Sequence, residues 1–100
     1  MITLEETIQI LTKDHNFREI IFGNHYSLDW PENPQFKHIS FDSRDVDQDT
    51  LFFAKGATFK KEYLEQAIQK GLGFYVSQVD YGLAIPAIIV TDIKKAMSLI

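Results

Sequence analysis

The chain has 100 residues, of which 45% are hydrophobic and 24% are charged, and its net charge is −4. This length fits one globular domain, and the apolar content is too high for a disordered segment. The acidic balance argues against a nucleic-acid-binding domain, and the lack of cysteine excludes disulfides and thiolate sites. No apolar run approaches the ~20 residues of a membrane span, and the N-terminus lacks a secretion signal. We therefore predict a soluble, cytoplasmic domain with no nucleic-acid or membrane partner.

The first third of the chain predicts one helix followed by less regular structure. Thr3 and Glu6 have the spacing of a capping box, and apolar residues follow at helical spacing, which predicts a helix over residues 4–13. The apolar run 17–22 fits either a strand or a helix. Residues 23–35 contain glycine, asparagine and proline breakers and are predicted to form a loop.

Beyond residue 36 the pattern is sharper. Ile39 and Phe41 alternate with polar residues, which predicts a half-buried strand that ends near residues 42–44. Short apolar runs predict three more strands, at residues 51–54, 74–76 and 86–90. The last run is continuously apolar, which indicates burial on both faces.

Two helices are predicted between and after these strands. The first spans residues 60–70 and stops at Gly71, and the second is capped by Asp92. The strand–helix–strand order predicts a small α/β domain in which helices flank a mostly parallel or mixed sheet. The chain ends on the apolar residues of the last helix, which predicts that it is a piece of a longer protein.

Motifs for catalysis are absent from the sequence. It has no glycine-rich phosphate loop, no dinucleotide-binding glycine motif and no Gly-x-Ser-x-Gly turn. Asp45, Asp47 and Asp49 have the spacing of a calcium loop, but Thr50 and Gly56 stand where that loop needs glycine and glutamate. The run is predicted to be a solvated turn, so no metal site is expected. The histidines are isolated from one another and are predicted to lie on the surface: His15, His25 and His38.

Two segments remain as candidates for ligand binding. Residues 41–44 (Phe-Asp-Ser-Arg) follow a predicted strand, where ligands of α/β sheets commonly bind. A turn held by a structural salt bridge explains the same residues, and physical grounds alone favour that alternative. Residues 55–61 form a lysine-containing loop before a helix, a place that suits a phosphate group. The alternative there is a solvated basic surface.

Taken together, these segments resemble the N-terminal domain of the Mur ligases, in its MurE type. The resemblance rests on Asp42-Ser43-Arg44, on the Leu-Phe-Phe-Ala run at 51–54, on Gly56 and on the helix that ends at Gly71. It covers roughly residues 39–100. The loop after Gly56 departs from the family pattern, because it is shorter and lacks the usual Asp-Gly.

The resemblance implies a three-layer α/β domain that binds the UDP-MurNAc portion of UDP-N-acetylmuramoyl-L-alanyl-D-glutamate. The full-length enzyme would use ATP and magnesium to add an amino acid, L-lysine by resemblance, during peptidoglycan precursor synthesis. Those cofactors and the catalytic residues would lie in other domains of the same chain, outside this fragment. The implied substrate contacts are Phe41, Ser43, Arg44, Ala57, Thr58 and Phe59.

Two other functions stay open at this point. Another Mur ligase, such as MurF, has a first domain with the same pattern. A non-enzymatic α/β module that binds a protein partner would also fit the composition, and it predicts no affinity for uridine nucleotides.

Overall fold

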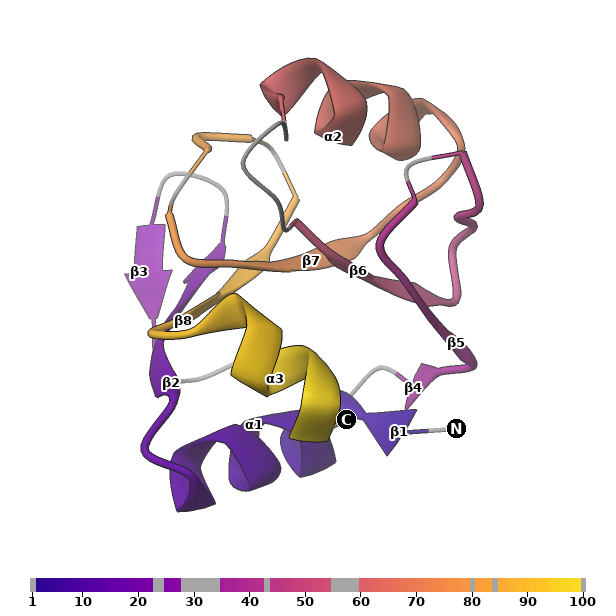
Figure 1. Ribbon diagram of the computed structural model, residues 1–100. Helices are drawn as coiled ribbons and strands as arrows, with labels where there is room; N and C mark the ends of the chain where they lie inside the picture. The colour runs from indigo at the N-terminus through magenta and orange to yellow at the C-terminus, as the bar shows by residue number, and fades with distance from the viewer. Residues whose placement is uncertain are drawn as a thin grey trace.

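The computed structural model describes residues 2–22, 25–27, 35–42, 44–54, 60–79, 81–83 and 85–99. A sheet forms the middle layer, with helix α2 on one face and helices α1 and α3 on the other (Figure 1). The helices are α1 (Leu4–Lys13), α2 (Lys61–Gln69) and α3 (Ile93–Leu99). The strands are β1 (Ile2–Thr3), β2 (Phe17–Phe22), β3 (His25–Ser27), β4 (Gln35–Phe36), β5 (His38–Ser40), β6 (Thr50–Phe53), β7 (Phe74–Ser77) and β8 (Ala87–Val90).

The main sheet is mixed, as predicted. Among the described residues it has six strands in the order β3-β2-β8-β7-β6-β5. The pairs from β5 to β8 are parallel, whereas β2 is antiparallel to both of its neighbours. A separate two-stranded ladder joins β1 and β4. Helix α2 connects the parallel strands β6 and β7, so α2 starts near the carboxyl end of β6.

The core is divided between the two faces by the alternation of side chains along the strands. On β6, Leu51 and Phe53 pack under α1 and α3, whereas Phe52 packs under α2 together with Ala54, which follows the strand. Strand β8 repeats this division, and all four of its residues are buried. This two-sided burial confirms the three-layer prediction and explains why the sequence of β8 is continuously apolar. No helix in the described ranges has both the length and the apolar character to cross a membrane.

Helix α1 begins and ends as the sequence predicts. The Thr3 hydroxyl accepts a hydrogen bond from the Glu6 amide at 3.1 Å, and the Glu6 carboxylate accepts one from the Thr3 amide at 3.0 Å. At the other end, His15 has a φ of 59°, in the left-handed region. Gly71 occupies the same place after α2, with a φ of 103°. Both helices therefore end in the same hydrogen-bonded motif, with glycine in one and histidine in the other.

The substitution His15→Gly is expected to raise the free energy of unfolding by about 0.5–1 kcal/mol, because glycine adopts this φ without steric cost. Urea denaturation of the two proteins measures the change. Gly71→Ala serves as the reverse control and should lower stability by a similar amount. A loss of stability in His15→Gly would show that the histidine side chain contributes more than its backbone strain costs.

Two strand predictions need correction. Residues 23–35 were predicted to be loop throughout, but His25–Ser27 form strand β3 against β2 and Gln35 begins β4. The predicted half-burial of β5 is wrong in its direction, because Ser40 is buried while Ile39 and Phe41 are 42% and 62% exposed. The physical reason is position: β5 is at the edge of the sheet, and the core cluster on its side stops at β6.

Candidate functional site

The turn after β5 is held by a carboxylate. Asp42 Oδ1 accepts hydrogen bonds from the Arg44 amide at 2.9 Å and from Arg44 Nε at 3.1 Å, and Asp42 Oδ2 accepts one from Arg44 Nη2 at 3.2 Å. The buried Ser40 hydroxyl accepts a bond from the Asp42 amide at 3.1 Å and donates to the Asp42 carbonyl at 3.2 Å. These hydrogen bonds therefore fix Asp42 relative to both Ser40 and Arg44.

A lysine ties this turn to the end of α2. Lys70, just after α2, donates from Nζ to the Arg44 carbonyl at 3.0 Å. Arg44 itself remains 83% exposed at its side chain, and its guanidinium holds the pKa of Asp42 below its ordinary value of 3.8 by hydrogen bonding. The structural salt bridge that the sequence offered as an alternative is thus present, and the same Asp42 carboxylate also holds the Arg44 backbone amide.

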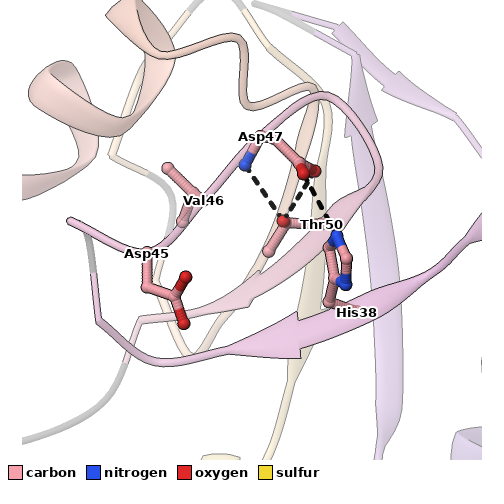
Figure 2. Close-up of a pocket in the computed structure, with 5 residues that line it drawn as sticks. All are labelled: His38, Asp45, Val46, Asp47 and Thr50. Atoms are coloured by element: carbon pink, nitrogen blue, oxygen red, sulfur yellow. Dashed lines mark hydrogen bonds and ion pairs between the residues drawn. The ribbon is translucent and has the colours of Figure 1, made fainter.

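The other half of the loop, residues 44–49, is organised by Asp47. Its Oδ1 accepts hydrogen bonds from the Asp49 amide at 2.8 Å and the Thr50 hydroxyl at 3.0 Å, and its Oδ2 lies 3.1 Å from His38 Nε2. Figure 2 shows the His38 ring and the Asp47 carboxylate pointing toward each other above Thr50. The Asp49 amide bond is the main cause that lowers the pKa of Asp47 below 3.8.

These residues line a shallow hollow of about 140 Å³. Its walls are His38, Asp45, Val46, Asp47 and Thr50 (Figure 2). Sites for drug-sized ligands are typically about 300–1,000 Å³, so the hollow is too small to enclose a nucleotide sugar. It lies beside the first residues of β5 and β6, and none of its lining residues belongs to the predicted contact set. Within the described ranges, no group of three or more His, Cys, Asp or Glu residues could hold a metal ion.

The pKa values of Asp42 and Asp47 give a pH prediction. Both carboxylates should titrate below 3.8 in an NMR titration of the side-chain carbons. Because a lowered folded-state pKa stabilises the fold only while the group is ionised, this contribution is complete above pH 3.8 and is lost as the pH falls through the folded-state value. Arg44→Ala should bring the pKa of Asp42 back toward 3.8 and leave Asp47 unchanged. An unchanged Asp42 in that variant would contradict the assigned cause.

The predicted contact residues divide into two groups. Phe41 and Arg44 are both exposed and lie on the same loop. Ser43 and residues 57–59, which are Ala, Thr and Phe, lie outside the described residues. Two of the six predicted residues therefore lie among the described residues of this loop. Two further residues, Ser40 and Lys70, hold the loop by hydrogen bonds and were not indicated by the sequence. No local pattern in the sequence pointed to Lys70, because its partner is 26 residues away.

The start of α2 is the second candidate position, whereas the candidate loop (residues 41–44) contacts the other end of this helix through Lys70. Its N-cap, Lys60, has an extended backbone and makes no side-chain capping hydrogen bond. The other two helices differ in this respect, since Thr3 caps α1 and Asp92 accepts the Lys95 amide of α3 at 3.1 Å. A helix start that its own N-cap side chain leaves uncapped, next to the exposed Lys60 and Lys61, has the chemistry that an anion requires.

Comparison with known proteins finds relatives that are similar in sequence to the whole of this chain. A UDP-N-acetylmuramoyl-L-alanyl-D-glutamate–L-lysine ligase of Streptococcus agalactiae is 62% identical over all 100 residues of this chain. The chain belongs to the Mur ligase family. Lysine ligases of the same name from Streptococcus thermophilus and Streptococcus pyogenes are each 57% identical over the whole chain. The chain spans only 21% of the length of these relatives.

A solved Mur ligase shares the fold. The crystal structure of MurF from Acinetobacter baumannii matches 91% of this chain with a TM-score of 0.65 and 18% sequence identity, and the match covers 19% of that protein. No protein-family model matches the chain. The sequence resemblance to the Mur ligases and the predicted α/β fold are therefore confirmed by two separate comparisons.

Proposed function

We propose that residues 1–100 are the N-terminal, UDP-MurNAc-binding domain of a cytoplasmic MurE-type ligase. In the complete enzyme, L-lysine would be joined to UDP-N-acetylmuramoyl-L-alanyl-D-glutamate in peptidoglycan precursor synthesis. The observation that carries the proposal is the 62% identity to a lysine ligase across the entire chain. The remaining domains of the ligase would be the partners of this one.

The candidate loop has features that suit a uridine nucleotide. Phe41 offers an exposed aromatic ring for the face of the base, and Asp42 and Arg44 are held to each other by hydrogen bonds. Ser43 would supply a directed hydrogen bond to the nucleotide. The α2 start, with Lys60 and Lys61, offers positive charge and backbone amides for a diphosphate. Ala57, Thr58 and Phe59 complete the proposed contact set on the loop that leads to α2.

The domain contributes binding and no bond-making step. ATP and magnesium would supply activation of the substrate carboxylate elsewhere in the ligase, since the sequence has no phosphate loop and the described residues include no metal-binding cluster. Binding energy gained at the nucleotide end would instead position the distant carboxylate for reaction.

NMR titration of the labelled domain with UDP-N-acetylmuramoyl-L-alanyl-D-glutamate tests the proposal. We expect amide shifts confined to residues 41–44 and 56–61, with weaker binding in Ser43→Ala. UDP-glucose serves as the control for recognition of the nucleotide alone. Weak affinity suffices, because even a millimolar Kd corresponds to about −4 kcal/mol. Shifts centred on the hollow beside His38 would contradict the site, and a full-length ligase that ignores this substrate would contradict the function.

The choice of amino acid is tested separately in the full-length enzyme. L-lysine should support ligation, whereas meso-diaminopimelate should be a poor substrate. MurF is the less favoured alternative, because its structure shares the fold at only 18% identity whereas the lysine ligases reach 62%. A ligase that accepts a dipeptide in place of a single amino acid would restore that alternative.

A further inference from the structure

One buried amide side chain joins the turn after α1 to the start of α3. Asn16, only 3% exposed, follows α1 and reaches the start of α3. Its Nδ2 donates to the Asp92 carbonyl at 3.0 Å, and its Oδ1 accepts from the Thr91 amide at 3.0 Å and the Asp92 amide at 2.8 Å. The Asn16 carbonyl also accepts from the Thr91 amide at 2.9 Å. A single residue thus satisfies three polar groups that are 75–76 positions away.

Helix α3 (Ile93–Leu99) depends on such contacts at its start. Its first amides need partners outside the helix. Beyond the contacts of Asn16, the Ile93 amide donates to Gln78 Oε1 at 2.9 Å, from the segment that follows β7. The entry of α3 is therefore built by two other parts of the chain.

Asn16 is itself held in a rigid turn. Its amide donates to the Leu11 carbonyl at 2.8 Å, which closes the end of α1, and the left-handed His15 precedes it. Asp14 in the same turn adds an ion pair with Lys95 of α3 at 3.3 Å. In Figure 1, α1 and α3 lie on the same face of the sheet, and this turn joins them at one end.

Few side chains of α3 are buried against the sheet. Ile93 and Ala96 are its buried residues, Met97 is partly buried, and Leu99 is 38% exposed. The hydrogen bonds at the start of α3 therefore contribute a large share of what keeps this helix on the sheet. Losing them would release α3 without removing side chains from the cluster under α2.

We propose that Asn16 is a latch that fixes where α3 begins and the direction in which it leaves the sheet. The latch is separate from the candidate binding loop, and opening it frees α3 while the rest of the domain stays folded. A second step rests on the proposed function: in the longer ligase the chain continues from α3, so Asn16 is a positioning residue that sets how this domain faces the part that follows.

Hydrogen exchange of the backbone amides tests the latch on the 100-residue chain. In Asn16→Ala, the amides of residues 96–99 should exchange about tenfold faster or more, because buried donors and acceptors lose their partners. The amides of α2 should change by less than about twofold, since local opening does not expose them. Gln69→Ala, at the exposed end of α2, is the matched control and should leave α3 unchanged.

A second variant keeps the test decisive if Asn16→Ala fails to fold. Gln78 is exposed, so Gln78→Ala should fold, and removing its bond to Ile93 should speed exchange in α3 by about threefold without affecting α2. Equal acceleration in α2 and α3, or none in either, would overturn the latch.

Kinetics of the full-length ligase separate this inference from the proposed function. Asn16→Ala should lower kcat by about tenfold while KM for the UDP substrate changes less than about twofold, because positioning and not nucleotide contact is altered. If the wild-type domain fails to bind the substrate, the proposed function fails while the exchange result on α3 still stands. If binding holds and α3 exchange is unaffected, the latch alone is wrong.

Discussion

Phe53→Ala is expected to lower the free energy of unfolding by about 3–5 kcal/mol, the usual cost of emptying a large buried site. Phe53 is completely buried under α1 and α3, and its neighbour Phe52 is completely buried on the opposite face under α2. A domain of this size is stabilised by only about 5–15 kcal/mol, so either truncation brings it close to unfolding. Urea denaturation at one temperature measures the loss of stability in Phe53→Ala and in the corresponding variant Phe52→Ala.

The same substitution at an exposed phenylalanine provides the control. Phe41 is 62% exposed, so Phe41→Ala should change stability by less than about 1 kcal/mol. Its effect should appear in substrate binding instead, because its ring is proposed to lie against the base. Equal destabilisation by Phe41→Ala and Phe53→Ala would contradict the burial assigned to β5 and β6.

The predictions that succeeded depend on neighbours in the sequence. The capping box of Thr3 and Glu6 spans one helical turn, and Gly71 ends α2 because only a local φ is at stake. The two-sided burial of β8 is visible in its unbroken apolar run. The Asp42–Arg44 turn is equally local, since the carboxylate bonds groups two residues ahead.

The predictions that failed depend on where an element sits in the finished fold. Ile39 has the pattern of a core residue, and it is exposed because β5 is an edge strand beyond the reach of α1 and α3. Strand β3 is three residues long within a segment rich in breakers, and its pairing with β2 supplies what its own sequence does not. The roles of Asn16 and Lys70 arise from partners that are distant in sequence, which no periodicity can reveal.

Asp42→Ala is expected to weaken binding of UDP-N-acetylmuramoyl-L-alanyl-D-glutamate by about tenfold or more, because a contact residue displaced by even ~1 Å loses much of its effect. The Asp42 carboxylate is the shared acceptor for the Arg44 amide and guanidinium, so its loss releases Arg44 from Asp42. Titration calorimetry with the full-length ligase measures the change in Kd.

Two companion variants separate holding the turn from touching the ligand. Asp42→Asn keeps an acceptor for the Arg44 amide and loses the charge, so its loss of affinity should be smaller than that of Asp42→Ala. Arg44→Ala keeps the backbone bond and removes only the guanidinium, so it should be milder still. If Arg44→Ala instead equals Asp42→Ala, the guanidinium contacts the substrate directly. If Asp42→Ala binds as the wild type does, the turn after β5 is not part of the nucleotide site, because the carboxylate that holds Arg44 is gone in that variant.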